Sequence, residues 1–189
     1  MHIKEYIKIF DQCISVNNIS SIIKFASKKC NFHDGLIIGS EKARKDIRDT
    51  QIYTFELNSN HLTAVHWYNY LNNIFLEVIK QYHFELKTME MFRYRILEIS
   101  LLKYQEKGHY TWHTDNDSKK FPRTLSMILQ LNNDYEGGNL CFRNQDGTEE
   151  WSVDTVPGRI IIWPSNFLYP HTVKPVTKGT RYSIVSWAI

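Results

Sequence analysis

Residues 159–188, which read RIIIWPSNFLYPHTVKPVTKGTRYSIVSWA, give the clearest indication of the fold. They contain three short runs rich in β-branched and aromatic side chains, which predict strands at Arg159–Trp163, His171–Lys174 and Thr180–Ala188. Turn residues separate these runs at Pro164-Ser165-Asn166 and at Lys178-Gly179. Short strands that follow one another at this spacing are typical of a sandwich or a jelly roll.

The same pattern extends back to about residue 92. Four further runs predict strands at Arg95–Tyr104, Tyr110–His113, Thr124–Leu131 and Gly138–Phe142. Glycine-containing turn signals, such as Asp146-Gly147, stand between the later runs. We therefore expect the second half of the chain to form a β-rich core.

The first half carries helical patterns instead. One apolar stripe predicts a helix of about 20 residues capped by Ser59 or Asn60, and it consists of Tyr68, Leu71, Phe75, Val78 and Tyr82. A shorter stripe from Ile19 to Cys30 predicts another helix, with Asn17 or Asn18 as its N-cap. The predicted fold class is thus mainly β with flanking helices (α+β). We expect one domain over residues 1–189, in which helical support over about 1–90 buttresses a jelly-roll core over about 91–189.

The composition describes a folded and mildly basic chain. Of 189 residues, 42% are hydrophobic and 14% aromatic, which argues against disorder. A formal net charge of +3 is too small to indicate a nucleic-acid partner. Three cysteines without short spacing favour a reducing compartment. The sequence also shows no signal peptide and no apolar run long enough for a membrane span, so we expect a soluble cytoplasmic protein. The oligomeric state is left open.

Two residues of one predicted strand region, His113 and Asp115, have a spacing that suits a metal site. On an extended chain, side chains two positions apart point to the same side, so both can reach one ion. His171, on another predicted strand, is the leading third ligand. Two imidazoles and one carboxylate form the facial triad of non-haem Fe(II) oxygenases, which leaves metal positions open for a cosubstrate and oxygen.

The last predicted strand adds a group that binds anions. Strand alternation places Arg181, Ser183, Val185 and Trp187 on one face. The Arg181 guanidinium can hold a carboxylate with two hydrogen bonds, and the Ser183 hydroxyl can add another.

These residues belong to a longer pattern that resembles the prolyl 4-hydroxylase group of Fe(II)- and 2-oxoglutarate-dependent dioxygenases. The pattern covers about 85 residues in the family's order, and it comprises Tyr104, Tyr110, His113, Asp115, Arg123, Ser126, Leu131-Asn132, Gly137-Gly138, Leu140, Pro157-Gly158, His171, Val173, Arg181, Ser183 and Trp187. A shorter stretch, from Asp46 to Thr54, resembles the loop that closes over peptide substrate in the oxygen-sensing prolyl hydroxylases.

The resemblance implies a double-stranded β-helix that holds the metal at its mouth. It implies that His113, Asp115 and His171 bind Fe(II), and that Arg181 pairs with the distal carboxylate of 2-oxoglutarate. The rest of the implied cosubstrate pocket consists of Tyr104, Ser183, Ile128, Leu140 and Trp187. Where the oxygen-sensing relatives have a tyrosine beside the distal carboxylate, this chain has Gln130, whose amide can still donate a hydrogen bond.

The implied reaction is the hydroxylation of a substrate C–H bond, coupled to the decarboxylation of 2-oxoglutarate to succinate and carbon dioxide. The implied cofactors and cosubstrates are Fe(II), 2-oxoglutarate and O2, with ascorbate as a reductant. The expected partner is a protein or peptide that contains proline. The segment Lys42–Thr54 is expected to form a lid in which Arg48 contacts the substrate. Arg123, just before a predicted core strand, is expected to be a second substrate contact.

Three alternatives remain open on the sequence alone. One is a hydroxylase of a free amino acid or another small molecule. A second is an oxidative nucleic-acid demethylase, although those enzymes carry a second arginine shortly after the cosubstrate arginine, and residues 186–189 offer none. The third is a catalytically silent binding module, which succinate formation would exclude.

Overall fold

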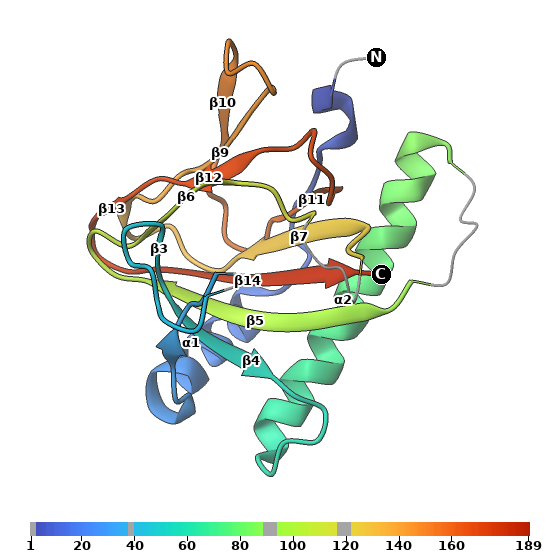
Figure 1. Cartoon of the computed structure of the whole chain (residues 1–189). Helices are drawn as coiled ribbons and strands as arrows, with labels where there is room; N and C mark the ends of the chain where they lie inside the picture. Colours follow the sequence, from blue (N-terminus) through green and yellow to red (C-terminus); the bar gives the residue numbers. More distant parts are fainter. Residues whose placement is uncertain (1–2, 38–39, 89–93, 117–121) are drawn as a thin grey trace.

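The computed structural model describes residues 3–37, 40–88, 94–116 and 122–189, in which two antiparallel sheets face each other (Figure 1). The larger sheet has seven strands in the order β1 (Lys8–Phe10), β11 (Ile160–Pro164), β7 (Leu125–Gln130), β14 (Arg181–Ala188), β5 (Ile96–Tyr104), β4 (Gln51–Phe55) and β2 (His33–Asp34). The smaller sheet has five strands in the order β10 (Glu150–Val153), β9 (Leu140–Arg143), β12 (His171–Val173), β6 (His109–His113) and β3 (Arg48–Asp49). A short pair of strands, β8 (Glu136–Gly137) and β13 (Val176–Lys178), completes the β structure.

Strand alternation gives the large sheet two apolar faces with different partners. On β14, Ile184 and Ala188 belong to the core that also contains the helices. Val185 and Trp187 belong to the core between the two sheets. Arg181 and Ser183 are buried on the same inner face as these two residues. The expected common face of the last strand is therefore confirmed, and it points toward the smaller sheet.

Two helices pack on the outer face of the large sheet (Figure 1). Helix α1 (Val16–Lys29) begins after Ser15, whose hydroxyl accepts a hydrogen bond from the Asn18 N–H. Helix α2 (Leu62–Leu86) has 25 residues and His61 as its N-cap, with no side-chain cap hydrogen bond. The predicted stripe on α2 is correct, because its members Leu71, Phe75, Val78 and Tyr82 are buried. The predicted caps at Asn17 or Asn18 and at Ser59 or Asn60 are wrong. A short 3-10 helix, η1 (Ile3–Tyr6), precedes β1.

The expectation that residues 1–90 only provide helical support is wrong. Strands β1, β2, β3 and β4 all lie in this half, and each pairs with a strand of one of the two sheets. Three of them are two or three residues long, so their sequences carry too little alternation to be recognised. Long-range pairing with β11, β4 and β6 forms them instead. The second half holds the mainly β, α+β core that was expected, with the additional short strands β8, β10 and β13.

Candidate functional site

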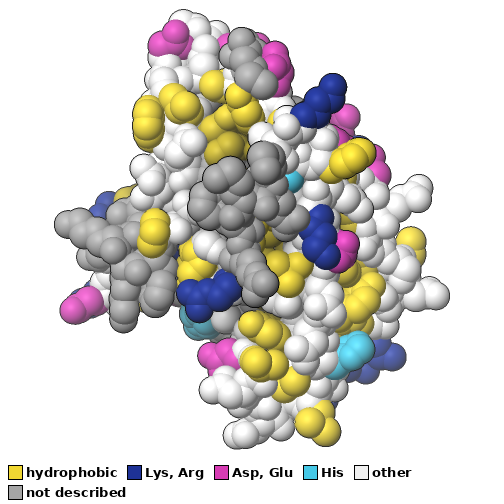
Figure 2. All heavy atoms as spheres, turned by 90° about the vertical axis from the view of Figure 1, so that its right-hand side faces the viewer, with side chains coloured by type: hydrophobic (Ala, Val, Ile, Leu, Met, Phe, Trp, Pro, Cys, Tyr) yellow, Lys and Arg dark blue, Asp and Glu magenta, His cyan; other side chains and the backbone are white. Residues whose placement is uncertain are grey.

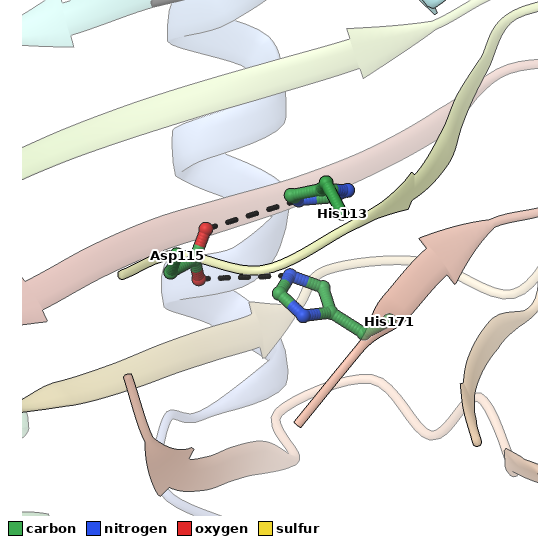
Figure 3. A group of neighbouring side chains, drawn as sticks. All are labelled: His113, Asp115 and His171. Atoms are coloured by element: carbon green, nitrogen blue, oxygen red, sulfur yellow. Dashed lines mark ion pairs between the residues drawn. The ribbon is translucent and has the colours of Figure 1, made fainter. Parts of the chain in front are cut away.

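Two histidines and one aspartate meet at the pairing of β6 with β12 (Figure 3). His113 ends β6 and lies opposite His171, which begins β12. Asp115 follows β6 by two residues and places Oδ1 at 3.8 Å from His113 Nε2 and Oδ2 at 3.5 Å from His171 Nε2. All three ligand atoms lie within 4.8 Å of one another. One divalent cation can therefore contact all three side chains.

Hydrogen bonds to the backbone prepare both histidines for metal binding. The Nδ1 atom of His113 lies 2.8 Å from the Thr111 carbonyl oxygen, and Nδ1 of His171 lies 3.1 Å from the Tyr169 carbonyl oxygen. Because a carbonyl only accepts, Nδ1 must carry the hydrogen in both rings. In the neutral rings the lone pair then lies on Nε2, the atom that faces Asp115. Such contacts fix the tautomer and orientation of metal-binding histidines.

The ionisation of the site also suits a cation. Burial lowers the pKa of His113 to about 3, so its ring is neutral at pH 7. Burial alone would raise the pKa of Asp115, but His171, His113 and a hydrogen bond from Ser126 hold it below the ordinary aspartate value. A neutral imidazole and an ionised carboxylate are the forms that bind metal.

A row of two serine hydroxyls supports Asp115 from the large sheet. Ser126 Oγ donates to Asp115 Oδ2 over 2.7 Å, and Ser165 Oγ lies 2.6 Å from Ser126 Oγ. Because the single hydroxyl hydrogen of Ser126 goes to the carboxylate, Ser165 must donate to Ser126. In the sequence Ser165 stands out only as a turn residue, and the pairing of Ser126 on β7 with Trp163 on β11 brings its hydroxyl near Asp115.

Arg181 lies in the interior without a negative partner. Its side chain is 1% exposed, and Nη1 donates to Ser183 Oγ over 2.8 Å. The guanidinium carbon lies 5.2 Å from the centre of the Tyr104 ring. Within the described part of the chain, no carboxylate forms an ion pair with Arg181. Because an unpaired buried charge is unfavourable, this environment favours an anionic ligand.

Gln130 presents a second group without a partner beside Arg181. Gln130 lies opposite Ser183 in the pairing of β7 with β14. Its Oε1 accepts a hydrogen bond from the Val156 N–H, whereas its buried Nε2 has no hydrogen-bond partner among the residues that the structure describes. A buried amide donor and a buried guanidinium together suit a carboxylate such as the distal end of 2-oxoglutarate.

A cavity of about 370 Å³ opens beside the three metal-ligand candidates. Its volume falls in the range of small-molecule sites. The predicted residues that line it are His113, Asp115, His171, Tyr104, Ile128, Trp187, Arg48 and Arg123. Arg181, Ser183, Gln130 and Leu140 are buried but are not among the lining residues. The structure thus brings the ligand candidates, the aromatic wall and both arginines to one cavity.

The two arginines proposed as substrate contacts both stack on aromatic rings of this cavity. The Arg123 guanidinium lies 3.7 Å from the centre of the Trp187 ring, and its Nη1 is 3.9 Å from Asp115 Oδ1. The Arg48 guanidinium lies 4.7 Å from the centre of the Tyr110 ring, and its Nη1 donates to the Leu36 carbonyl oxygen. Arg48 belongs to β3, so the expectation that residues 42–54 form one lid loop is wrong. Residues 48–49 and 51–55 are strands.

Two imidazoles and one carboxylate on one side of a cavity form the ligand set of non-haem Fe(II) oxygenases. Residues 99–189 match the model of the 2OG-Fe(II) oxygenase superfamily, so this half of the chain is similar to that superfamily. The superfamily uses Fe(II), 2-oxoglutarate and O2. The resemblance found in the sequence is therefore confirmed.

Curated relatives match the same half of the chain. A PKHD-type hydroxylase of Synechococcus sp. is 37% identical over 105 residues, which is 54% of this chain and 45% of the relative. A PKHD-type hydroxylase of Idiomarina loihiensis is 32% identical over 96 residues, which is 49% of this chain and 42% of the relative. The chain thus spans less than half the length of these relatives.

Solved structures match the fold over nearly the whole chain. A Pseudomonas putida prolyl-4-hydroxylase has a TM-score of 0.69 at 19% identity, and the match covers 96% of this chain and 91% of that one. A Trichoplax adhaerens prolyl hydroxylase, solved with a hypoxia inducible factor oxygen degradation domain peptide, has a TM-score of 0.76 at 17% identity, with 98% and 84% covered. These matches confirm the double-stranded β-helix fold.

Proposed function

We propose that this chain is an Fe(II)- and 2-oxoglutarate-dependent dioxygenase that hydroxylates a C–H bond of a protein or peptide, with a prolyl residue as the target. The observation that carries the proposal is the position of three ligand atoms within 4.8 Å of one another, with both histidine tautomers set for metal binding. The match of residues 99–189 to the oxygenase model supports the same chemistry.

The buried groups of this chain fit both the metal and the cosubstrate. His113, Asp115 and His171 would hold Fe(II) through two imidazole nitrogens and one carboxylate. Arg181 and the unpartnered Nε2 of Gln130 would hold the distal carboxylate of 2-oxoglutarate. When bound, iron and 2-oxoglutarate supply the oxidising chemistry, in which 2-oxoglutarate becomes succinate and carbon dioxide while one oxygen atom enters the substrate. The apolar wall of Ile128, Val185 and Trp187 would exclude water from that reaction.

A peptide substrate is supported by the cavity and by the structural neighbours. Arg48 and Arg123 line the cavity and can donate hydrogen bonds to peptide carbonyl groups. The Trichoplax adhaerens neighbour was solved with a peptide fragment bound. Prolyl specificity rests on the names of the structural neighbours and on the sequence resemblance.

A nucleic-acid substrate is disfavoured by the distribution of charge. On the face shown in Figure 2, the described lysine and arginine side chains stand apart from one another instead of forming a continuous stripe. The net charge of the chain is only +3. This face therefore lacks the continuous basic surface that phosphate binding requires, and the small net charge gives little overall attraction for phosphates.

We also propose that residues 1–189 act as one unit in the cytoplasm. The larger and the smaller sheet each contain strands from both halves of the chain, which supports a single unit. Cys13, Cys30 and Cys141 are free, which suits a reducing compartment. Among the described residues, no helix has the length and apolarity needed to cross a bilayer.

The test has two stages. Fe(II) and 2-oxoglutarate added without oxygen should produce a weak visible charge-transfer band, and a protein without this band would contradict the metal assignment. Proline-containing peptides incubated with oxygen should then gain the mass of one oxygen atom, with succinate formed in equal amount. Succinate without any peptide product would contradict the proposed substrate and leave the oxygenase assignment standing.

A further inference from the structure

We propose that the active-site cavity contains a cation subsite, formed by Glu98 with Ser100 and Thr54, that binds a protonated amine or guanidinium of the substrate. The inference rests on the proposed function, because it assigns a substrate feature to the same cavity. All three residues line the cavity that contains His113, Asp115 and His171.

The subsite lies on the inner face of β5, at the end away from Arg181. Glu98, Ser100, Leu102 and Tyr104 alternate along that face, and all four line the cavity. In the pairing of β5 with β14, Tyr104 lies opposite Arg181, whereas Glu98 lies opposite Trp187. The Tyr104 end is the one assigned to the distal carboxylate of the cosubstrate. Glu98 is six residues along the strand from Tyr104. Its carboxylate is therefore not used to bind the cosubstrate and can contact the substrate.

A row of hydroxyls fixes the Glu98 carboxylate. Ser100 Oγ donates to Glu98 Oε1 over 2.5 Å, and Thr54 Oγ1 lies 2.8 Å from Ser100 Oγ. A carboxylate only accepts, so the single hydroxyl hydrogen of Ser100 is used, and Thr54 must be the donor to Ser100. Ser100 is 1% exposed, so the packed side chains around it restrict the movement of its hydroxyl. Thr54 and Ser100 are therefore positioning residues for Glu98.

The charge of Glu98 has no partner in the described part of the chain. No ion pair reaches its carboxylate there, and no hydrogen bond reaches Oε2. Arg123 and Arg48 line the same cavity, but neither lies within ion-pair distance of Glu98. A carboxylate with one oxygen fixed and the other open to a partly enclosed cavity attracts a cation more strongly than it would in bulk water. A basic side chain next to the target residue, or a free α-ammonium group, would supply that cation.

The experiment measures binding to the Fe(II)- and 2-oxoglutarate-loaded protein without oxygen, so it does not depend on turnover. Isothermal titration compares Nα-acetyl-lysine amide, which carries only a side-chain cation, with norleucine amide, which carries only an α-ammonium group. Nα-acetyl-norleucine amide carries neither and serves as the neutral probe. The two cationic probes distinguish the two sources of the charge.

At least one cationic probe should bind about tenfold or more tightly than the neutral probe, as expected for a charge-assisted hydrogen bond in a partly enclosed site. Glu98→Gln keeps the side-chain volume and should remove this preference. Thr54→Val should reduce it while leaving Glu98 in place. Glu56→Gln makes the same charge change on an exposed residue outside the cavity, and this variant should retain the preference for the cationic probe.

Equal binding of all three probes, absence of saturable binding, or an unchanged preference in Glu98→Gln would each overturn the subsite. These outcomes are separate from the proposed function, which fails instead when no charge-transfer band and no succinate are formed.

Discussion

His113 and His171 lie opposite each other across strands β6 and β12, with ring centres 4.2 Å apart. Each ring gives its Nδ1 hydrogen to a carbonyl oxygen two residues earlier in its own chain segment. The register of two strands that are distant in the sequence therefore places two Nε2 lone pairs on one side, facing Asp115.

Removal of one of the three ligand side chains should strongly weaken iron binding. Asp115→Ala and His171→Ala each delete one of three contacts, so Fe(II) affinity should fall by at least about 100-fold, beyond the loss typical of outer-shell changes. Anaerobic titration of the charge-transfer band measures this. His109→Ala, on the same strand but outside the three ligands, should leave the band intact. A full band in Asp115→Ala would contradict the site.

Loss of the Ser126 hydroxyl should weaken the metal site without removing a ligand. Ser126 donates to Asp115 Oδ2 and orients the carboxylate, so Ser126→Ala should lower Fe(II) affinity by about tenfold. Ser126→Thr keeps a hydroxyl at the same position and should restore most of the affinity. If the Ser126→Ala and Ser126→Thr variants bind Fe(II) with equal affinity, the hydroxyl has no positioning role.

Gln130→Glu should weaken 2-oxoglutarate binding. The change preserves an oxygen that can accept the hydrogen bond from the Val156 N–H, but replaces the unpartnered Nε2 donor with an acceptor. A carboxylate facing a carboxylate should lower affinity by about tenfold or more. The dissociation constant of 2-oxoglutarate, measured with Fe(II) present and oxygen absent, tests this. An unchanged constant would place the distal carboxylate elsewhere.

Arg48→Ala should affect the substrate and spare the cosubstrate. Arg48 lines the cavity and stacks on Tyr110, whereas Arg181 lies outside the lining of that cavity. The KM for a peptide substrate should rise by about tenfold, while succinate formation without peptide stays nearly unchanged. Arg44→Ala, at an exposed arginine that pairs with Asp46, is the matched control. A parallel loss of uncoupled succinate formation would assign Arg48 a structural role instead.

An ion pair at the edge of the large sheet should make stability depend on pH. Arg159 donates from Nε and Nη2 to the two carboxylate oxygens of Asp11 and lowers the pKa of Asp11. A lowered folded-state pKa gives stability that is present above the ordinary value of 3.8 and is lost as pH falls through the lower folded value. Asp11→Asn should cost about 0.5 kcal/mol at pH 7, because the Asp11 side chain is half exposed and water weakens its attraction to Arg159.

Urea denaturation at pH 7 and at pH 2 tests the pair. The difference between wild type and Asp11→Asn should be present at the higher pH and small at the lower one. It should also shrink at high salt. A difference that is the same at both values would mean that the loss comes from packing.

Much of the fold could be predicted because the second half has clear local patterns. All seven strands predicted there exist, including the run that becomes β14, because turn residues bound short runs rich in β-branched and aromatic residues. The helix stripe from Leu71 to Tyr82 was recognisable because its apolar residues recur every three or four positions. Strands β1 and β3 could not be predicted, because they have three and two residues and form only through pairing with β11 and β6.

Local sequence patterns were sufficient to identify the residue types that carry the chemistry. The spacing of His113 and Asp115, and the alternation of Arg181 with Ser183, follow from the geometry of an extended chain. How these residues meet depends on tertiary contacts. They set His171 opposite His113, leave the Gln130 Nε2 donor without a partner among the described residues of neighbouring strands, and bring Thr54 of β4 to the Ser100 hydroxyl of β5 that supports Glu98. These relationships join residues from different strands, so strand register and packing fix them, and no local pattern in the sequence encodes either.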